Sequence, residues 1–200
     1  MKCLVNLFNA LEPELDSLDR PVGDGDHGSA LKRGFEAAAA KLSNLNDDEL
    51  PRTVLMTVSS GFVNGAGGAS GLLFSILFKE LGRACNESPR LKAPEFSKGL
   101  MASVEEIAKL GKTKIGDKTM LDALHPASLA AAGKESGSLV AAIGAAAAAA
   151  ETGALTTIGM AAKQGRARYV SEGGKGHMDP GAKSVAYILQ SLQQQVESVS

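Results

Sequence analysis

The chain has 200 residues, a formal net charge of −1, 44% hydrophobic residues and only 4% aromatic residues. This length suits one domain with its own core, and no linker-like segment divides it, so we expect a single domain over residues 1–200. The near-neutral charge argues against a nucleic-acid partner, and no apolar run approaches membrane-spanning length, so we expect a cytoplasmic protein that binds neither nucleic acid nor membrane. Cys3 and Cys85 stand far apart among apolar residues, which indicates unpaired thiols.

The first predicted helix leads into an acidic loop. Apolar residues recur every three or four positions from residue 4 to residue 18, and the helix should end near Asp19. The loop contains Asp24 and Asp26 between glycines, so three short carboxylates can converge if the backbone curls. Hard oxygen ligands of this kind suit Mg²⁺ or Ca²⁺. The alternative is an acidic turn that caps the next helix.

Calcium is the weaker choice of metal at this loop. An EF-hand needs a glutamate at its twelfth position, and Phe35 occupies that position when counting starts at Asp24. A second helix over residues 28–42 follows, and its first N–H groups would face the loop, where an anion can bind.

A second glycine-rich helix entrance follows further along the chain. Residues 46–51 are expected to form a loop, and residues 54–62 a third helix. The segment 64–71 is rich in glycine and precedes an apolar helix over residues 72–81. Such an entrance suits a phosphate group, although tight packing between helices would explain the glycines equally well. It is not a Walker A loop, because no Gly-Lys-Ser/Thr follows.

The second half of the chain predicts four more helices. A fifth helix covers residues 96–110, with Gly111 as its C′ residue. Asp117 would cap the sixth, with Thr119 as the alternative cap. A seventh helix is expected over residues 138–163, because a run of alanines continues an apolar face. Asp179 followed by Pro180 predicts the start of the eighth.

The expected fold is therefore all-α, built from about eight amphipathic helices joined by glycine-rich loops, since no segment alternates like a long strand. Basic residues at 163, 166 and 168 lead into one of these loops, where a solvated basic turn is the alternative to a ligand site.

Four separated blocks resemble the L subunit of dihydroxyacetone kinase. They are Leu18-Asp19 with residues 23–28, then residues 67–71, then residues 116–120, and finally residues 165–169 with residues 176–181. The resemblance implies a barrel of eight antiparallel helices, with the nucleotide site in the loops at one end and two Mg²⁺ ions beside an ADP or ATP.

The resemblance also implies site residues. The metal ligands would be Asp19, Asp24 and Asp26. The nucleotide-binding residues would be His27, Gly28, Ser29, Ala30, Ala69, Ser70, Gly111, Met120, Arg166, Asp179, Pro180 and Gly181.

Three departures from the family pattern stand out. Residues 61–66 intervene between Ser59-Ser60 and Gly67, which predicts a longer loop and an altered phosphate geometry. The segment before Asp19 is short for the family, and residues 169–173 lack a family arginine.

By this resemblance the chain is a kinase subunit that transfers a phosphoryl group to dihydroxyacetone or a similar small ketose held on a K-type partner subunit. The donor is either free ATP or an ADP recharged by an M-type phosphocarrier of the phosphotransferase system. A nucleotide-dependent regulator that contacts a transcription factor is the alternative, and a metal-dependent phosphohydrolase is a third possibility.

Overall fold

The computed structural model describes residues 1–46 and 48–198, and within them the chain forms eight α-helices, three short 3₁₀ helices and no strand. This confirms the all-α prediction. Asp47, in the loop expected over residues 46–51, lies outside the described residues. The helices are α1 (Lys2–Asp19), α2 (His27–Leu42), α3 (Pro51–Gly65), α4 (Gly68–Ala84), α5 (Ala93–Gly111), α6 (Leu121–Ala132), α7 (Leu139–Thr156) and α8 (Pro180–Ser198).

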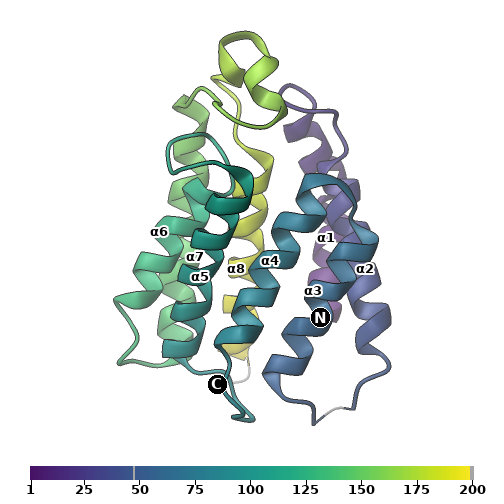
Figure 1. Cartoon of the computed structure of the whole chain (residues 1–200), viewed down its shortest axis with the longest axis vertical. Helices are drawn as coiled ribbons and strands as arrows, with labels where there is room; N and C mark the ends of the chain where they lie inside the picture. The colour runs from purple at the N-terminus through teal and green to yellow at the C-terminus, as the bar shows by residue number, and fades with distance from the viewer. Residues whose placement is uncertain (47, 199–200) are drawn as a thin grey trace.

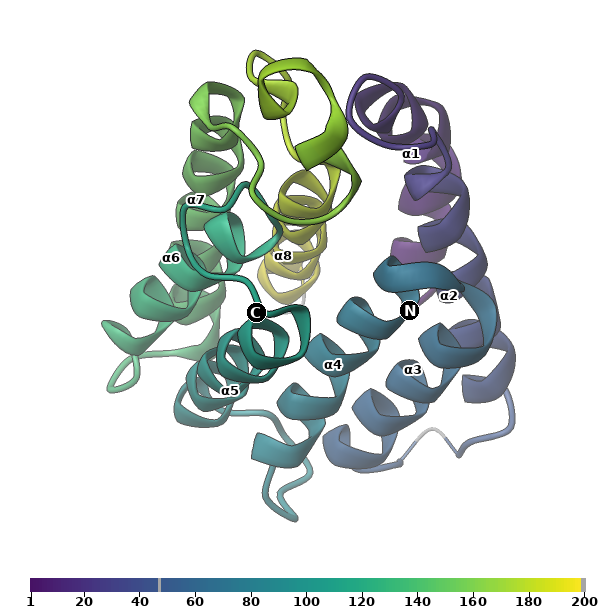
Figure 2. The same cartoon turned by 45° about the horizontal axis from the view of Figure 1, so that its top comes forward.

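The helices form a closed ring. Each helix packs against the next one along the chain, and α1 contacts α8. Figure 1 shows the helices running along one axis, and Figure 2 shows them arranged around it. Since successive helices run in opposite directions, the loops divide between the two ends of the barrel. Residues 20–26, 66–67, 112–120 and 157–179 lie at one end, which we call the pocket end. Residues 43–46, 48–50, 85–92 and 133–138 lie at the other, the closed end.

Two kinds of packing fill the barrel. Between α1 and α4 the interior is aromatic: Phe35 stacks on Phe8 with ring centroids 4.4 Å apart and meets Phe62 edge-on at 4.9 Å. Rings of this size bury much apolar area. Between α6 and α8 the interior is mostly alanine, and α7 approaches α6 so closely that a Cβ on Gly153 would lie 2.2 Å from the carbonyl oxygen of Asp122.

Helix α7 corrects the expectation that no segment has membrane-spanning properties. Together with the 3₁₀ turn that follows it, the span Leu139–Gly159 is long and apolar enough to cross a membrane by length and composition. Core helices of soluble proteins share these properties. One face of α7 is buried between α6 and α8, which identifies it as a wall of the barrel.

Four boundaries differ from those expected. The seventh helix ends at Thr156 instead of continuing to residue 163, because the chain turns there into the long connection to α8. Gly111 is the last residue of α5, and the left-handed residue after it is Lys112 (φ 49°). The Asp117 carboxylate does not cap α6: it accepts hydrogen bonds from the Lys114 amide (2.9 Å) and the Thr113 hydroxyl.

The fourth difference concerns residues 61–66. They do not lengthen a loop: residues 61–65 complete α3 and Ala66 caps it, so one residue, Gly67, leads into α4. Gly61 lies against the backbone of Ala38, where an added Cβ would come within 2.4 Å. The extra residues thus bring α3 against α2 and leave the α4 entrance short.

Candidate functional site: a pocket among four loops

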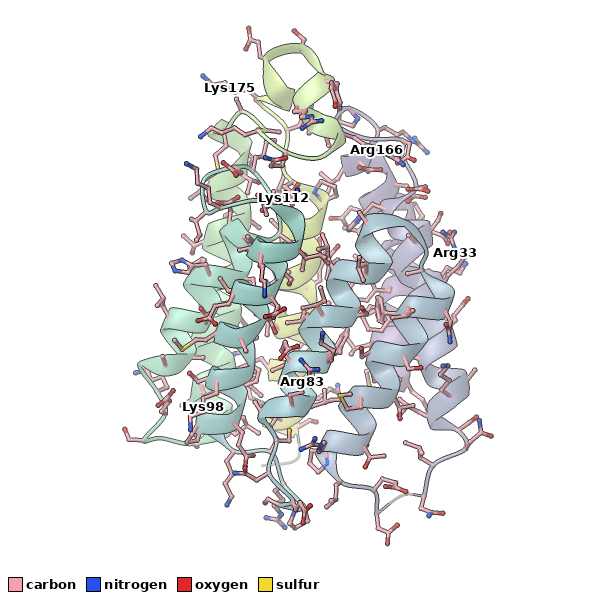
Figure 3. All side chains as sticks on the ribbon, in the orientation of Figure 1. Arg33, Arg83, Lys98, Lys112, Arg166 and Lys175 are labelled. Atoms are coloured by element: carbon pink, nitrogen blue, oxygen red, sulfur yellow. The ribbon has the colours of Figure 1, made fainter. Side chains whose placement is uncertain are left out.

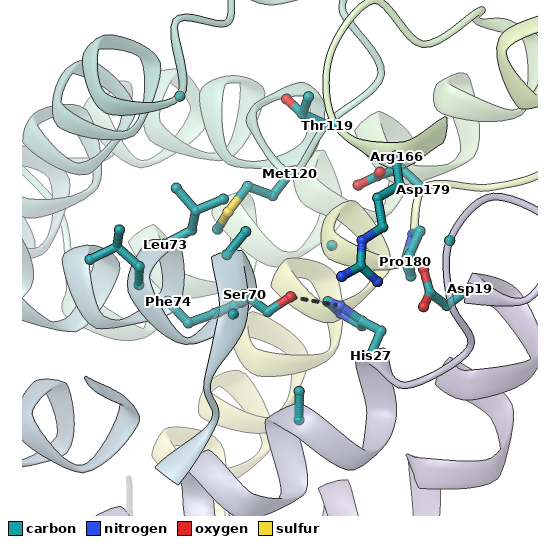
Figure 4. Close-up of a pocket in the computed structure, with 18 of the residues that line it drawn as sticks. Asp19, His27, Ser70, Leu73, Phe74, Thr119, Met120, Arg166, Asp179 and Pro180 are labelled. Atoms are coloured by element: carbon teal, nitrogen blue, oxygen red, sulfur yellow. Dashed lines mark hydrogen bonds between the residues drawn. The ribbon is translucent and has the colours of Figure 1, made fainter. Parts of the chain in front are cut away.

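A pocket of about 550 Å³ opens at the pocket end, lined by residues from all four loops there. Figure 4 shows side chains from α2, α4, α8 and the connecting segments facing the same space. Most of the residues expected at a nucleotide and metal site line it: Asp19, Asp24, Asp26, His27, Ala30, Ala69, Ser70, Gly111, Met120, Arg166, Asp179, Pro180 and Gly181.

Gly28 and Ser29 do not line the pocket. The Ser29 hydroxyl donates to the Asp16 carboxylate (2.9 Å), and the Ser29 amide donates to its other oxygen (3.0 Å). A Cβ on Gly28 would lie 2.3 Å from the carbonyl oxygen of Glu12. Both residues therefore hold the start of α2 against α1.

The three carboxylates converge as the acidic loop requires. Asp19 is the buried last residue of α1, and its Oδ2 accepts hydrogen bonds from the amides of Gly25 (2.8 Å) and Asp26 (3.2 Å), which curls the loop back on the helix. One oxygen each from Asp19, Asp24 and Asp26 then lies within 4.8 Å of the others. A Cβ on Gly23 would lie 2.1 Å from Asp19 Oδ1, so a larger residue there would displace this carboxylate.

This donor set fits a hard divalent cation. Three carboxylates so close together repel one another unless positive charge lies between them, and oxygen ligands are those that Mg²⁺ prefers. The Arg166 guanidinium forms an ion pair with Asp24. Both side chains are largely exposed, so the pair alone contributes little stability. Figure 4 shows Arg166 extending into the pocket toward His27.

The start of α4 is built to receive an anion. Gly67 (φ 70°) and Gly68 (φ 58°) both have left-handed backbone, and no side chain caps the helix. An added Cβ on either glycine would meet nothing within 4 Å, so helix packing does not explain them. The first amides of α4 therefore face the pocket without side-chain partners, which suits phosphate oxygens.

A buried hydrogen-bond chain connects α8, α2 and α4. The Ser184 hydroxyl donates to the Pro180 carbonyl oxygen (2.9 Å), so its oxygen accepts from His27 Nε2 (2.9 Å). His27 Nδ1 is then the acceptor for the Ser70 hydroxyl (3.2 Å). Burial lowers the pKa of His27 to about 4, which keeps the ring neutral in this arrangement. The lone pairs of the Ser70 oxygen remain directed away from His27.

The far wall of the pocket is apolar. Leu73 and Phe74 lie on α4, and Met120 extends toward Leu73, as Figure 4 shows. Ile107 and Leu110 of α5 also line the pocket. A flat apolar group such as a purine base fits such a surface.

Sequence reasoning missed Lys118 and Asp122 as parts of the site. Lys118 lines the pocket, is 2% exposed and has left-handed backbone (φ 62°). Asp122 is buried and accepts hydrogen bonds from the amides of Gly116 (2.5 Å) and Thr119 (2.8 Å), which shapes the loop before α6. The available signal was a lysine between an aspartate and a threonine in a glycine-bounded loop.

Asp179 joins this cluster from the start of α8. Its carboxylate accepts a hydrogen bond from the Ala182 amide (2.7 Å), as the Asp179-Pro180 pattern predicted. Burial raises the pKa of Asp179 to about 7, although the Ala182 amide and Lys118 oppose this shift.

The loops at one end of this helical barrel combine a carboxylate cluster, an uncapped helix N-terminus and an apolar wall. These features together indicate an all-α protein that binds a nucleotide with a divalent metal. The sequence matches the DAK2 domain over residues 21–194. The chain belongs to the DAK2 domain family, which confirms the resemblance found in the sequence.

Relatives and a solved structure agree with this assignment. The chain is 34% identical to the "PEP-dependent dihydroxyacetone kinase, ADP-binding subunit DhaL" of Escherichia coli, covering 94% of this chain and 90% of the relative. It is 36% identical to the "L-erythrulose kinase" of Pectobacterium atrosepticum, covering 90% of this chain and 31% of that one. The dihydroxyacetone kinase of C. freundii in complex with AMP-PNP and Mg²⁺ superposes with a TM-score of 0.70 at 27% identity, covering 96% of this chain. This chain spans 32% of the length of that kinase.

Proposed function

We propose that this chain is the nucleotide- and magnesium-binding subunit of a dihydroxyacetone kinase, forming one domain over residues 1–200. It would transfer a phosphoryl group from its bound nucleotide to dihydroxyacetone or a similar small ketose. The observation that carries the proposal is the convergence of the Asp19, Asp24 and Asp26 carboxylates with the α4 entrance and Arg166 in one pocket. The ADP-binding relative, which the chain matches over nearly its full length, supports it.

Within this proposal the pocket divides into three parts. Asp19, Asp24 and Asp26 hold Mg²⁺, which when bound neutralises phosphate charge and orients the transferred group. The amides of Ala69 and Ser70 hold the phosphates, and Arg166 closes over them. Gly111 and Met120 contact the base, while the turn Asp179-Pro180-Gly181 and the residues His27 and Ala30 form the floor. Gly28 and Ser29 contribute by fixing the start of α2.

We propose two Mg²⁺ ions. Three carboxylates with one Mg²⁺ carry a charge of about −1 toward an ATP of about −4, whereas two Mg²⁺ give about +1 and attraction. The three carboxylates that would hold these ions are the buried Asp19 and the exposed Asp24 and Asp26.

The ketose is proposed to bind on a separate K-type subunit. About two thirds of the length of the longer relatives lies outside the region that matches this chain, which leaves room for a ketose-binding part in those proteins. The L-erythrulose kinase shows that relatives differ in substrate, so the identity of the ketose would depend on that partner. A cytoplasmic location is part of the proposal, since α7 serves as a wall of the barrel.

The test is reconstitution. The purified chain, a ketose-binding subunit of a dihydroxyacetone kinase, Mg²⁺ and dihydroxyacetone are combined with ATP, or with ADP and the phosphocarrier proteins. Phosphorylated ketose should form only when both subunits are present. Phosphate release by the chain alone would instead identify a phosphohydrolase, and nucleotide binding without transfer would favour a regulator.

Mass spectrometry of the purified protein distinguishes the two donors. An ADP that survives purification in a one-to-one ratio indicates a recharged coenzyme, which the PEP-dependent name of the E. coli relative favours. An empty chain that binds ATP reversibly indicates a free donor.

A further inference from the structure

The long segment between α7 and α8 covers one side of the pocket. This cover segment, residues 157–179, contains the 3₁₀ helices Thr157–Gly159, Arg166–Tyr169 and Ser171–Gly174. It places Gln164, Gly165 and Arg166 at the pocket, and Figures 1 and 3 show it at the pocket end of the barrel, with Arg166 and Lys175 on it. A segment of this length must be fixed at its base if Arg166 is to stay over the acidic loop.

The base of the cover segment closes on a single ammonium group. Lys118 Nζ donates hydrogen bonds to the carbonyl oxygens of Thr157 (2.6 Å) and His177. Thr157 begins the cover segment and His177 lies near its end, so one side chain joins the two ends of the segment. Two further bonds close the same base: the Asp179 amide donates to Thr157 Oγ1 (2.9 Å), and the Gly176 amide donates to the Ile158 carbonyl oxygen (2.7 Å).

The loop before α6 is shaped to present this lysine. The left-handed backbone at Lys118 is strained for a residue with a Cβ. It is held on either side by carboxylates, since Asp117 binds the Lys114 amide and Asp122 binds the Thr119 amide. The Asp117 carbonyl oxygen in turn accepts from the Lys163 amide (3.1 Å), a second tie between this loop and the cover segment.

The surroundings of Lys118 favour a fixed ammonium. Its side chain is buried, and burial lowers its pKa, while the nearby Asp179 and Asp122 carboxylates favour the charged form. A hydrogen bond from a charged donor is stronger than a neutral one. The two hydrogen bonds from the Lys118 ammonium therefore hold the two ends of the cover segment together. No other described cation joins these ends.

We propose that Lys118 is a positioning residue that fixes the base of the cover segment, keeps Arg166 over the metal and phosphate region, and thereby slows release of the nucleotide. This inference rests on the proposed function, and it states that Lys118 lengthens the residence time of the nucleotide in the same pocket. Lys118 acts through Arg166, so its effect should disappear when Arg166 is absent.

A double-mutant cycle tests this. The release of a fluorescent ADP analogue from the Mg²⁺-loaded chain is measured by stopped flow for the wild type, Lys118→Met, Arg166→Ala and the double variant. Each single change should accelerate release about tenfold, and the double variant should release no faster than Arg166→Ala. Lys175→Met is the matched control, since Lys175 is exposed on the same segment and should leave release unchanged.

Trypsin provides a readout specific to the cover segment. In Lys118→Met, cleavage after residues 163, 166 and 168 should become faster in the ADP-bound protein, while cleavage elsewhere stays the same. If Lys118→Met does not fold, Lys118→Gln replaces it, because the shorter, neutral side chain removes the ammonium that joins the Thr157 and His177 carbonyl oxygens. Thr157→Val, which removes the Asp179-to-Thr157 bond, tests the same base with Lys118 in place.

The outcomes separate this inference from the proposed function. Failure of the wild type to bind the ADP analogue overturns the function. Normal binding with unchanged release in Lys118→Met and Thr157→Val overturns the role of Lys118 alone. Effects of Lys118→Met and Arg166→Ala that multiply in the double variant would show that Lys118 does not act through Arg166.

Discussion

The two ends of the barrel use different backbone conformations to do the same job of connecting helices. At the closed end, the described residues of the loops 43–50, 85–92 and 133–138 contain no residue with positive φ. At the pocket end, all four connections contain them, including the non-glycine residues Lys112, Lys118 and Glu172. Left-handed positions are not needed to reverse the chain, since the described residues of the closed-end loops lack them, and three of those at the pocket end, Gly67, Lys118 and Gly165, line the pocket.

The largest expected effect distinguishes acidic residues at the two ends. Asp24→Asn or Asp26→Asn should weaken Mg²⁺-dependent ADP binding by about a hundredfold or more, because each removes a charged ligand from the carboxylate cluster. Asp48→Asn at the closed end is the control and should bind ADP normally. Calorimetry with and without Mg²⁺ measures all three. Normal ADP binding in both loop variants would show that the three carboxylates form only a turn and do not bind the metal.

The pocket end also holds two titratable groups with opposite effects on stability, the buried His27 and the partly buried Asp179. The pKa of His27 is lowered to about 4, so the unfolded chain binds the extra proton between about pH 6.5 and 4, and stability falls on acidification. The pKa of Asp179 is raised to about 7, so the folded chain binds the extra proton between about pH 4 and 7, and stability rises on acidification. In the wild type the two changes largely cancel.

Asp179→Asn should remove the compensation, while its side-chain oxygen can still accept from the Ala182 amide. Between pH 7 and pH 4.5 the variant should lose about 2–3 kcal/mol more free energy of unfolding than the wild type. Urea titrations at both pH values in chelator measure this. Parallel pH profiles for the two proteins would contradict the raised pKa of Asp179, and His27→Gln should change the profile in the opposite direction.

Two serines at helix starts provide the next comparison. Ser138 caps α7 at the closed end, where its hydroxyl accepts from the Ala141 amide (3.1 Å), whereas Ser70 in the first turn of α4 bonds His27 instead. Ser70→Ala should weaken ADP binding about tenfold or more, through loss of a polar contact to a charged ligand. Ser138→Ala should lower stability by about 1 kcal/mol and leave ADP binding unchanged. A Ser70→Ala protein that loses stability alone would remove this residue from the site.

The smallest effect compares glycines. Gly68 has φ 58°, whereas Gly133 at the closed end has φ −64°. Gly68→Ala should destabilise the protein by about 1 kcal/mol and also impair ADP binding, while Gly133→Ala should stabilise it by about 0.5 kcal/mol. Chemical denaturation of the two variants tests the sign. A destabilised Gly133→Ala protein or a tolerated Gly68→Ala would show that backbone strain does not separate the two ends.

The closed end and the helices themselves could be predicted from sequence because their determinants are local. Apolar spacing identified most of the helices, although the sixth was expected from a cap at Asp117 that the structure does not show. The Asp179-Pro180 pattern marked a true helix start. At the pocket end, short motifs in the sequence were enough to predict the acidic loop at residues 19–26 and the glycine-rich helix start at residues 67–70. Helix propensity overextended α7 past Thr156, since nothing local shows that the chain must turn there.

Lys118 was not predictable for a physical reason. Its partners are backbone carbonyl oxygens 39 and 59 residues away, and a carbonyl leaves no trace in the sequence. Ser29 was misplaced for a related reason, because the rotation of α2 against α1 decides whether it meets the ligand or Asp16. Motifs identify which residues assemble, whereas helix packing decides which of them face inward.

The contact between Gly153 and Asp122 makes the spacing of two helices a determinant of chemistry. The Asp122 carboxylate shapes the loop before α6. The backbone carbonyl oxygen of Asp122 lies so close to α7 that a Cβ on Gly153 would come within 2.2 Å of it. A displacement of α6 by the width of that methyl group would be carried along the rigid helix end to Met120 and Lys118. The close packing of α7 against α6 thus helps to set the dimensions of the pocket. Substitutions in this alanine-rich wall would change how the ligand fits even though the substituted residues do not contact it.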